Sequence, residues 1–262
     1  MQEALAQLRW YLDMGVDEAL EEQPQNRLAL VQPVPEPVMP GLAEAPAPAL
    51  KSPTAPSFAA SASVAETQAL AEAATTLDAL RDAVYAFKGL SICRTATNPV
   101  FAEGNPKARL MIIGEAPGAE EDRQGVPFCG PSGQLLDKML ASIGYNRQEN
   151  AYITNTIFWR PPGNRNPTVE EQSICRPLVD KHIALIDPEM IFLVGGMAVR
   201  SLLQKEESLG SLRGREFNYI NPFNTKSYKI RISYHPSYLL RTPQQKRLAW
   251  QDLLQLKTAL RS

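Results

Sequence analysis

The stretch Leu110–Lys138 reads LMIIGEAPGAEEDRQGVPFCGPSGQLLDK. Its opening run, Leu110–Ile113, is apolar, short and followed by glycine, which is typical of a buried strand and too short for a helix. After Gly130, leucine and methionine recur at helical spacing and predict an amphipathic helix. The unit therefore predicts a strand that delivers an acidic loop to the edge of an α/β sheet, where ligands of such folds bind.

The loop between this strand and this helix offers three kinds of binding group. Glu115, Glu121 and their acidic neighbours supply carboxylates, and Phe128 supplies an aromatic surface. The N-terminus of the following helix supplies backbone N–H groups that suit an anion. Together these groups indicate a site for a flat, polar ring beside a phosphate. An ordinary Gly/Pro turn with solvated acidic side chains is the alternative interpretation.

The rest of the chain continues the alternation of short apolar strands and helices. We expect strands at 109–114, 151–157, 190–195 and 229–234, and helices at 66–89, 132–143, 168–186, 197–203 and 243–260. Such alternation predicts a parallel sheet covered on both faces, with right-handed crossovers that bring the strand-to-helix loops to one edge. The sequence therefore predicts a three-layer α/β/α fold around a central four-stranded parallel sheet.

The N-terminal quarter of the chain differs from the remainder. Residues 1–22 predict an amphipathic helix, because apolar residues recur at three- and four-residue spacing. Residues 23–65 are rich in Pro and Ala and poor in large apolar side chains, which predicts a disordered linker. The folded domain is expected over 66–262. The N-terminal helix either binds a protein partner or packs loosely on its own domain.

Charge is distributed unevenly along the chain. Before Glu66 there are three Lys or Arg against eight Asp or Glu, so this part carries −5 and the remainder +4 of the net −1. A basic body behind an acidic tail is compatible with DNA contact by the body, but proteins that touch no DNA share this pattern.

The cysteines and the hydropathy indicate the compartment. Cys93, Cys129 and Cys175 stand at no metal-ligand spacing, and such an odd, scattered set without a signal-peptide pattern indicates a reducing environment. No apolar run is long enough to span a membrane. We expect a cytoplasmic monomer.

Two further strand-to-helix loops carry residues suited to DNA. The second loop starts at Asn155, and its segment WRPPGNRNP contains Arg160 and Arg165, which suit phosphate contacts, although a rigid surface turn is the alternative. The last loop begins at His235, on the same predicted edge as the carboxylates. In contrast, His182 lies within a predicted helix among apolar residues, which indicates a structural role.

The last loop also carries an unusual pair of leucines. Leu239 and Leu240 stand beside Arg241 in the run HPSYLLR. Exposed leucines in such a place can act as a wedge that fills a gap in stacked bases. The alternative is that both leucines are tucked under the final helix.

These motifs, GEAPG with EED, PFCGPSGQLL, YITN, RPPGNRNPTVEE and HPSYLLR, occur in this order. In content and spacing the set resembles the fourth family of uracil-DNA glycosylases, the thermostable iron–sulfur type. The resemblance covers roughly residues 98–260. It implies a uracil-DNA glycosylase-like fold and a base-excision repair enzyme that hydrolyses the N-glycosidic bond of uracil in DNA. The base would be flipped out of the stack and water would be the nucleophile.

The resemblance implies a role for each catalytic side chain. Phe128 would stack on the base, a contact worth on the order of 1–3 kcal/mol, and Asn155 would pair with uracil O4 and N3–H. His235 would stabilise the departing uracil anion near O2. Glu115 or Glu121 would stabilise charge at the sugar or orient the water. Which glutamate acts stays open, because Ala116 stands where the first family has its aspartate.

The resemblance also implies two groups of binding residues. The base pocket would include Gly114, Ala116, Pro117, Gly118, Phe128 and Asn155. DNA contacts would come from Ser132, Arg160, Arg165, Ser237, Leu239, Leu240 and Arg241, with Ser237 at a phosphate.

The sequence departs from the family at the cluster ligands. The family uses four cysteines, but the first three positions fall here on Phe87, Leu90 and Trp159, and only Cys175 remains. One thiolate cannot hold a cluster that takes four. We therefore expect no metal and no cofactor, with the three replacements filling the space as a small apolar core.

Two other functions stay open at this point. The first is a catalytically weak module of the same fold that binds DNA and recruits a repair partner. The second is an enzyme for another lesion, such as a thymine or hypoxanthine mispair, because Gly118 leaves room beside C5 of the base.

Overall fold

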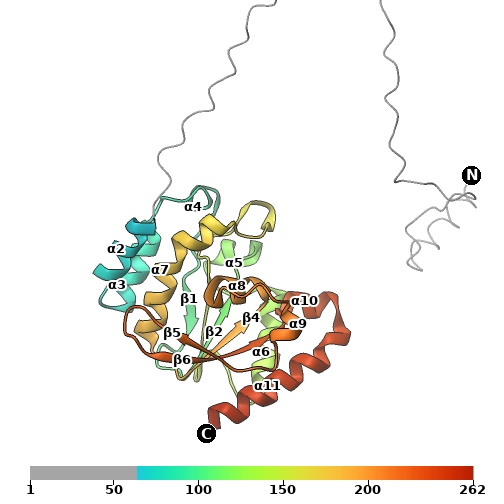
Figure 1. Cartoon of the computed structure of the whole chain (residues 1–262). Coiled ribbons are helices and arrows are strands. Elements are labelled where there is room, and N and C mark those ends of the chain that lie inside the picture. The colour runs from blue at the N-terminus through green and yellow to red at the C-terminus, as the bar shows by residue number, and fades with distance from the viewer. Residues whose placement is uncertain (1–63, 262) are drawn as a thin grey trace, which may run out of the picture. The chain divides into compact units, whose positions relative to one another are not determined.

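A six-stranded sheet forms the centre of the computed structural model, which describes residues 64–261 (Figure 1). Its strand order is β1-β3-β2-β4-β6-β5. The strands are β1 (Ala102–Gly104), β2 (Leu110–Gly114), β3 (Ala151–Asn155), β4 (Met190–Val194), β5 (Phe217–Ile220) and β6 (Ser227–Ser233). Strands β3, β2, β4 and β6 are parallel, whereas β1 and β5 pair antiparallel at the two edges.

The four predicted strands are confirmed as the parallel centre, but a sheet of four strands is wrong. The two additional strands escape a search for apolar runs for different reasons. Strand β1 has only three residues, all half-buried, and β5 alternates between exposed and more buried positions. Edge strands of this kind need no continuous apolar run, because one side of each faces solvent.

Helices cover both faces of the sheet, as predicted (Figure 1). Alternate residues of β2 point to opposite faces, so Met111 and Ile113 join one core cluster and Leu110 and Ile112 join the other. The helices are α2 (Val64–Ala73), α3 (Leu77–Ala86), α4 (Ile92–Thr95), α5 (Ala119–Gln124), α6 (Pro131–Ser142), α7 (Val169–Ile186), α8 (Gly196–Leu203), α9 (Leu209–Leu212), α10 (Pro236–Arg241) and α11 (Lys246–Arg261). Short 3-10 turns lie at Pro162–Asn164 and Pro243–Gln245.

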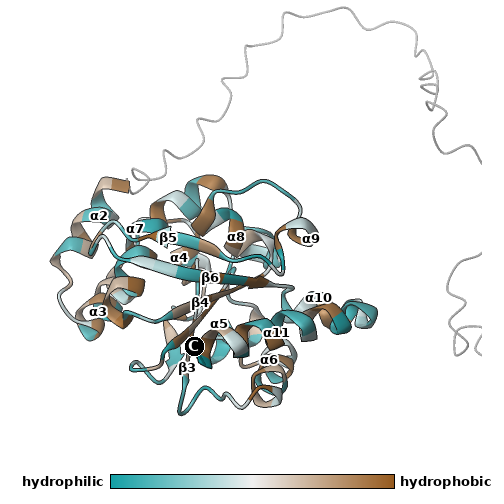
Figure 2. Cartoon of the chain, turned by 60° about the horizontal axis from the view of Figure 1, so that its bottom comes forward, coloured by the Kyte–Doolittle hydropathy of each residue, from teal (hydrophilic) through white to brown (hydrophobic). Residues whose placement is uncertain are grey.

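The two helical layers bury different sets of side chains. The first cluster takes residues of α2, α3, α7 and α8, and the second takes residues of α6 and α11. In Figure 2 the hydrophobic colour is strong on the inner strand β4, whose five residues are all buried. Such runs are expected where a parallel strand is covered on both faces.

The single helix predicted over 66–89 is wrong, because two helices occupy this part of the chain. Helix α2 ends at Ala73, and Thr76 caps the start of α3 by accepting the N–H of Ala79 at 3.1 Å. A threonine hydroxyl in this position satisfies a backbone donor that the first helical turn leaves free, and so favours a new start. Helix α2 then packs against α7.

The parallel register carries the functional loops to one edge. Gly114 at the end of β2 is paired with Asn155 at the end of β3, and Val194 of β4 is paired with Ser233 of β6. The loops that follow these four positions therefore begin at the same level. The predicted N-terminal helix (1–22) and nearly all of the linker (23–65) lie outside the described residues. Among the helices of 64–261, none combines the length and the apolar content needed to cross a bilayer.

Candidate active site

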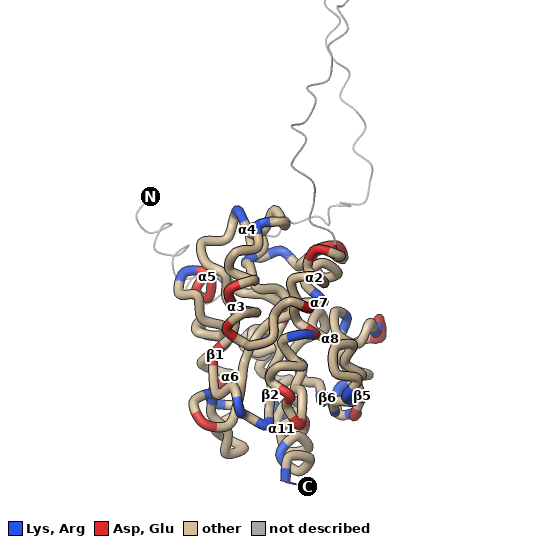
Figure 3. Tube along the Cα trace, turned by 90° about the vertical axis from the view of Figure 1, so that its left-hand side faces the viewer, with Lys and Arg blue, Asp and Glu red and all other residues tan. Residues whose placement is uncertain are grey.

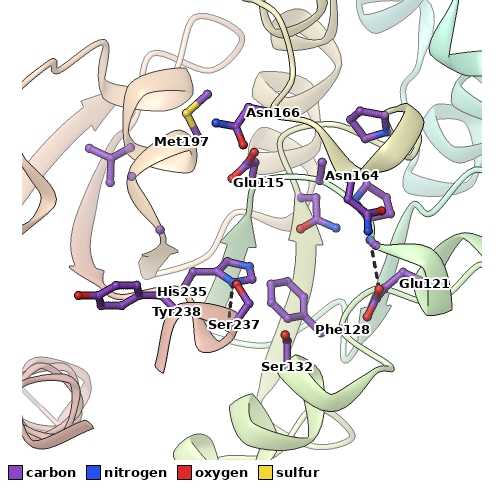
Figure 4. Close-up of a pocket in the computed structure, with 18 of the residues that line it drawn as sticks. Glu115, Glu121, Phe128, Ser132, Asn164, Asn166, Met197, His235, Ser237 and Tyr238 are labelled. Atoms are coloured by element: carbon purple, nitrogen blue, oxygen red, sulfur yellow. Dashed lines mark hydrogen bonds between the residues drawn. The ribbon is translucent and has the colours of Figure 1, made fainter. Parts of the chain in front are cut away.

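A cavity of about 770 Å³ lies at the carboxyl edge of the sheet (Figure 4). The loops after β2, β3, β4 and β6 all contribute to its wall. It brings together twelve of the predicted site residues: Glu115, Ala116, Pro117, Gly118, Glu121, Phe128, Ser132, Asn155, Arg165, His235, Ser237 and Arg241. Gly114, Arg160, Leu239 and Leu240 are not among its lining residues. The cavity is therefore built from the three loops that the sequence singles out, together with the loop after β4.

Phe128 and Asn155 converge on the end of β2. A Cβ atom placed on Gly114 would lie 2.5 Å from Asn155 Oδ1 and 2.5 Å from Phe128 Cζ. Only a residue without a side chain lets the amide and the ring approach each other this closely. Gly114 thus contributes to the site without lining the cavity, because its missing side chain leaves room for Asn155 and Phe128.

The amide of Asn155 is almost completely buried, with 1% of the residue exposed. Its Oδ1 atom has no hydrogen-bond partner among the described residues. A buried acceptor left in this state costs free energy, on the order of 1–3 kcal/mol. A ligand that donates an N–H here would recover that cost.

His235 is the N-cap of α10, and the backbone sets its tautomer. Its Nδ1 atom accepts the backbone N–H of Ser237 at 3.1 Å and lies 2.8 Å from Ser237 Oγ. Because a backbone nitrogen can only donate, Nδ1 carries no proton, and the proton of the neutral ring resides on Nε2. Burial, helped by the positive charge of Arg241, lowers the pKa of His235 to about 4. The imidazole is neutral at physiological pH.

The ring of His235 also contacts the predicted stacking residue. The ring centroids of Phe128 and His235 lie 5.5 Å apart with an interplanar angle of 31°. Figure 4 shows both rings on the same side of the cavity. The loop after β4 fixes this arrangement from behind, because a Cβ on Gly195 would lie 3.1 Å from His235 Cβ.

The structure distinguishes the two candidate glutamates. The carboxylate of Glu121 accepts three backbone N–H groups, from Gly118 at 3.1 Å, Cys129 at 3.1 Å and Gly130 at 3.0 Å. Through the Gly118 N–H it caps the start of α5, and through the other two N–H groups it ties the loop after Phe128 to that helix. With these three bonds the carboxylate is occupied by its own loop.

In contrast, the carboxylate of Glu115 receives no hydrogen bond from any residue within 64–261. Glu115 directly follows β2 and lines the cavity, and burial raises the pKa of its carboxyl. Of the two glutamates, it is the one free to act on a ligand.

The predicted arginines of the second loop are already engaged. Arg165 donates two hydrogen bonds to the carboxylate of Glu171, at 2.8 Å and 2.7 Å, within the capping box of α7. Arg160 donates to Asn164 Oδ1 at 2.7 Å. Both contacts order the loop, and only Arg165 lines the cavity.

The prediction that Leu239 and Leu240 are both exposed is wrong for Leu239. Leu239 is 1% exposed and belongs to the core cluster under α11, whereas Leu240 is 43% exposed. The pair lies within α10, and successive residues of a helix point in different directions. Of the two, only Leu240 is available to contact a ligand.

The structure adds residues that sequence reasoning missed. Asn166, Met197, Arg200 and Tyr238 also line the cavity. Met197 and Arg200 follow the glycine pair after β4, so the same strand-to-helix rule that located the other loops could have located them. Arg147 lies behind the Phe128 loop, and nothing in its local sequence marks it.

The region of the expected cluster positions is apolar and closely packed. Phe87, Leu90 and Trp159 are all buried, and the rings of Phe87 and Trp159 lie 5.6 Å apart. Cys175 is fully buried in the same core cluster. Residues 64–261 contain no group of three or more His, Cys, Asp or Glu able to hold a metal. These side chains do not fit an iron–sulfur cluster.

Two smaller expectations can also be compared with the structure. His182 is fully buried, stacks on Phe101 with centroids 4.3 Å apart, and has a pKa lowered to about 3 by burial, as expected for a structural residue. Gly118 lines the cavity, and a Cβ on it would lie 2.8 Å from Glu121 Oε2, but the room expected beside C5 of the base stays a prediction.

Sequence comparisons agree with this geometry. The family profile described as the Uracil DNA glycosylase superfamily matches residues 101–254. The Type-4 uracil-DNA glycosylase of Saccharolobus solfataricus is 35% identical over 192 residues, which cover 71% of this chain and 87% of that protein. The Type-4 enzyme of Sulfurisphaera tokodaii is 31% identical over 186 residues, or 70% of this chain and 84% of that protein. The Type-4 enzyme of Thermotoga maritima is 36% identical over 168 residues, or 63% and 84%. With an aromatic ring, an amide and a neutral imidazole around one cavity and relatives of this kind, the chain belongs to the uracil DNA glycosylase superfamily.

Proposed function

We propose that this protein excises uracil from DNA by hydrolysing the N-glycosidic bond between the base and deoxyribose. The observation that carries the proposal is that Phe128, Asn155 and His235 line one cavity, although they come from three separate loops. The type-4 glycosylases among its relatives support the same reaction.

Binding would begin with a uracil flipped out of the helix, at a cost of a few kcal/mol. The ring of Phe128 would offset part of this cost by stacking, on the order of 1–3 kcal/mol. The buried Oδ1 of Asn155 would accept the N3–H of uracil, and the amide N–H₂ would donate to O4. Cytosine has an acceptor at N3 and a donor at C4, so it would leave both groups of the amide mispaired.

Cleavage leaves negative charge on the base and positive charge on the sugar. The neutral His235 would donate its Nε2–H to O2 and stabilise the uracil anion as the C1′–N1 bond breaks. Water would supply the oxygen that bonds to C1′. The ionised carboxylate of Glu115 would stabilise the sugar cation and take up the proton that the water loses. Glu121 would keep the loop of Phe128 in place without touching the reacting atoms.

Release of free uracil from a uracil-containing oligonucleotide tests the proposal. We expect excision by the wild type and a loss of at least about 100-fold in Glu115→Ala, Asn155→Ala and His235→Ala, which corresponds to about 2.7 kcal/mol or more. The matched control is Arg81→Ala, because Arg81 is a partly exposed residue of α3 that does not line the cavity. A wild type that shifts the oligonucleotide in a gel but releases no uracil would support the DNA-binding module instead.

We also propose that the protein works without an iron–sulfur cluster. The buried contact between Phe87 and Trp159 supports this, because it fills space with side chains that cannot ligate iron. Purified protein should carry no stoichiometric iron and no absorbance band in the blue visible region. Protein with both features would refute the proposal, and loss of activity on treatment with an iron chelator would contradict it too.

The remaining proposals concern the protein in the cell. Uracil-containing DNA would be its partner, and the protein would act as a monomer in the cytoplasm. Light scattering after size exclusion tests the monomeric state, for which a mass near 28.9 kDa is expected. Residues 1–22 would bind a protein partner, and this segment lies outside the described residues.

A further inference from the structure

The loop that carries Phe128 adopts a conformation that its own residues do not favour. Phe128 has φ of +51°, in the left-handed region that bulky residues rarely occupy. Its carbonyl is pressed against α6, where a Cβ on Gly133 would lie 1.7 Å from Phe128 O. A strained aromatic residue at a binding site persists only when its surroundings hold it.

Arg147 holds this loop through the loop's carbonyl groups. Its side chain is 8% exposed, and it comes from the segment before β3. Its NH2 group donates to Phe128 O at 2.9 Å, and NH1 donates to Pro127 O at 3.2 Å. The guanidinium therefore binds the carbonyls of the two peptide bonds that flank Phe128.

Every donor of this guanidinium is used. Beyond the two carbonyls, Nε and NH2 donate to Asp137 Oδ1 at 2.9 Å and 2.7 Å, and NH1 donates to Glu103 at 2.7 Å. Five N–H groups thus make five hydrogen bonds, which is the full capacity of an arginine. A lysine, with one small ammonium group, cannot reproduce this planar set.

Cation and anion together fix the loop. Arg147 binds the carbonyls of residues 127 and 128, while the carboxylate of Glu121 binds the N–H groups of residues 129 and 130. We propose that Arg147 is a positioning residue for the excision of uracil: it holds Phe128 in its left-handed conformation and so presents the ring to the flipped base. The inference rests on the proposed function and assigns a residue outside the cavity to it.

A double-mutant cycle in uracil excision tests this role. We expect Arg147→Met to lower kcat/KM by about 5- to 150-fold, the range of one base–aromatic contact. The loss should lie mainly in KM, because stacking holds the base before and during cleavage. In a Phe128→Ala background, Arg147→Met should lower kcat/KM little further, because the ring through which Arg147 acts is gone. Additive losses in the cycle would overturn the proposal.

Arg147→Lys keeps the charge and should still lose most of the effect, and it carries the cycle if Arg147→Met does not fold. The matched control is Arg176→Met. Arg176 pairs with the buried Asp180 at 2.6 Å and donates to Ser201 O at 2.6 Å, but it does not line the cavity. Its loss should affect stability and leave KM unchanged. An equal rise of KM in both variants would overturn the proposal.

A second measurement does not depend on activity. Cys129 follows Phe128 and is half-buried, whereas Cys93 and Cys175 are buried. A thiol reagent should label Cys129 faster in folded Arg147→Met than in the wild type, and at the wild-type rate in Arg176→Met. Unchanged labelling would refute the hold on the loop. If Cys129 is labelled faster in Arg147→Met than in the wild type but the wild type releases no uracil, the proposed function alone is refuted.

Discussion

At the scale of the residue, His235 connects backbone geometry to chemistry. Its position as N-cap of α10 directs the N–H of Ser237 at Nδ1, which leaves the proton on Nε2. Burial then keeps the ring uncharged by lowering its pKa to about 4. In the proposed mechanism, a neutral imidazole would stabilise the departing uracil anion by donating a hydrogen bond, and it would not transfer a proton to it.

The pH dependence of excision follows from the two titrating groups of the site. His235 is competent above its pKa of about 4, and the raised pKa of Glu115 means that its carboxylate becomes ionised only at a higher pH than usual. The acid limb of single-turnover excision should therefore report Glu115. In Glu115→Gln the residual rate should be nearly independent of pH until it falls close to pH 4. The idea fails if the acid limb is the same in both proteins.

At the scale of the element, α10 gives adjacent leucines different roles. Leu239 is part of the core beneath α11, and Leu240 faces outward from the same turn. The sequence HPSYLLR allowed either arrangement, because a run this short has no periodicity that fixes which face is buried.

Paired substitutions separate these roles. Leu239→Ala should lower the free energy of unfolding by about 2–5 kcal/mol, as truncations of buried leucines do. Leu240→Ala should leave stability within about 0.5 kcal/mol, and should slow excision from double-stranded DNA more than from single-stranded DNA. The physical reason is that only a duplex has a gap for the side chain to fill. Urea unfolding and excision from both substrates measure this, and equal slowing on the two substrates would speak against a wedge.

The elements also show how far sequence reasoning reaches. The four inner strands were predictable because strands buried on both faces need continuous apolar runs, as in β4. The edge strand β1 was not, because three half-buried residues carry no such run. The break at Thr76 had a local signal in its capping hydroxyl, but the leucines on both sides suggested one long helix.

The same division holds for the site. Asn155 and His235 were predictable because both stand where a parallel strand ends, a place that topology assigns to ligands. The difference between Glu115 and Glu121 was not, since it depends on which carboxylate meets the N–H groups of a loop eight or nine residues later. Arg147 was missed for the same reason: its partners lie ten to 44 residues away in the chain.

At the scale of the whole molecule, charge separates the N-terminal part from the rest. The chain carries −1 in total, of which −5 lies before Glu66 and +4 after it. Figure 3 shows Lys and Arg interspersed with Asp and Glu over the described part, so its positive excess is spread out and not gathered in one stripe.

Removal of residues 1–63 should therefore strengthen binding to DNA. The truncated protein would carry +4 instead of −1, and we expect a lower KM for a uracil-containing oligonucleotide at low salt, by roughly two- to tenfold. The difference should vanish near 1 M salt, where screening acts within about 3 Å. We expect kcat to stay unchanged, because the whole cavity is built from residues after Gly114. A fall in kcat would mean that the N-terminal part takes part in the reaction.

The pairing of Gly114 with Asn155 across β2 and β3 has a consequence for the proposed recognition of the base by Asn155. Neighbouring strands are held about 4.8 Å apart by their hydrogen-bond ladder, so the backbone that carries the Asn155 amide cannot shift relative to the end of β2. Substitutions in the loops can change the affinity for a base, but they do not change the spacing of these two strands. A change in which base is accepted would then require a different side chain at position 155, because the fixed strand spacing also fixes the position of the Asn155 amide.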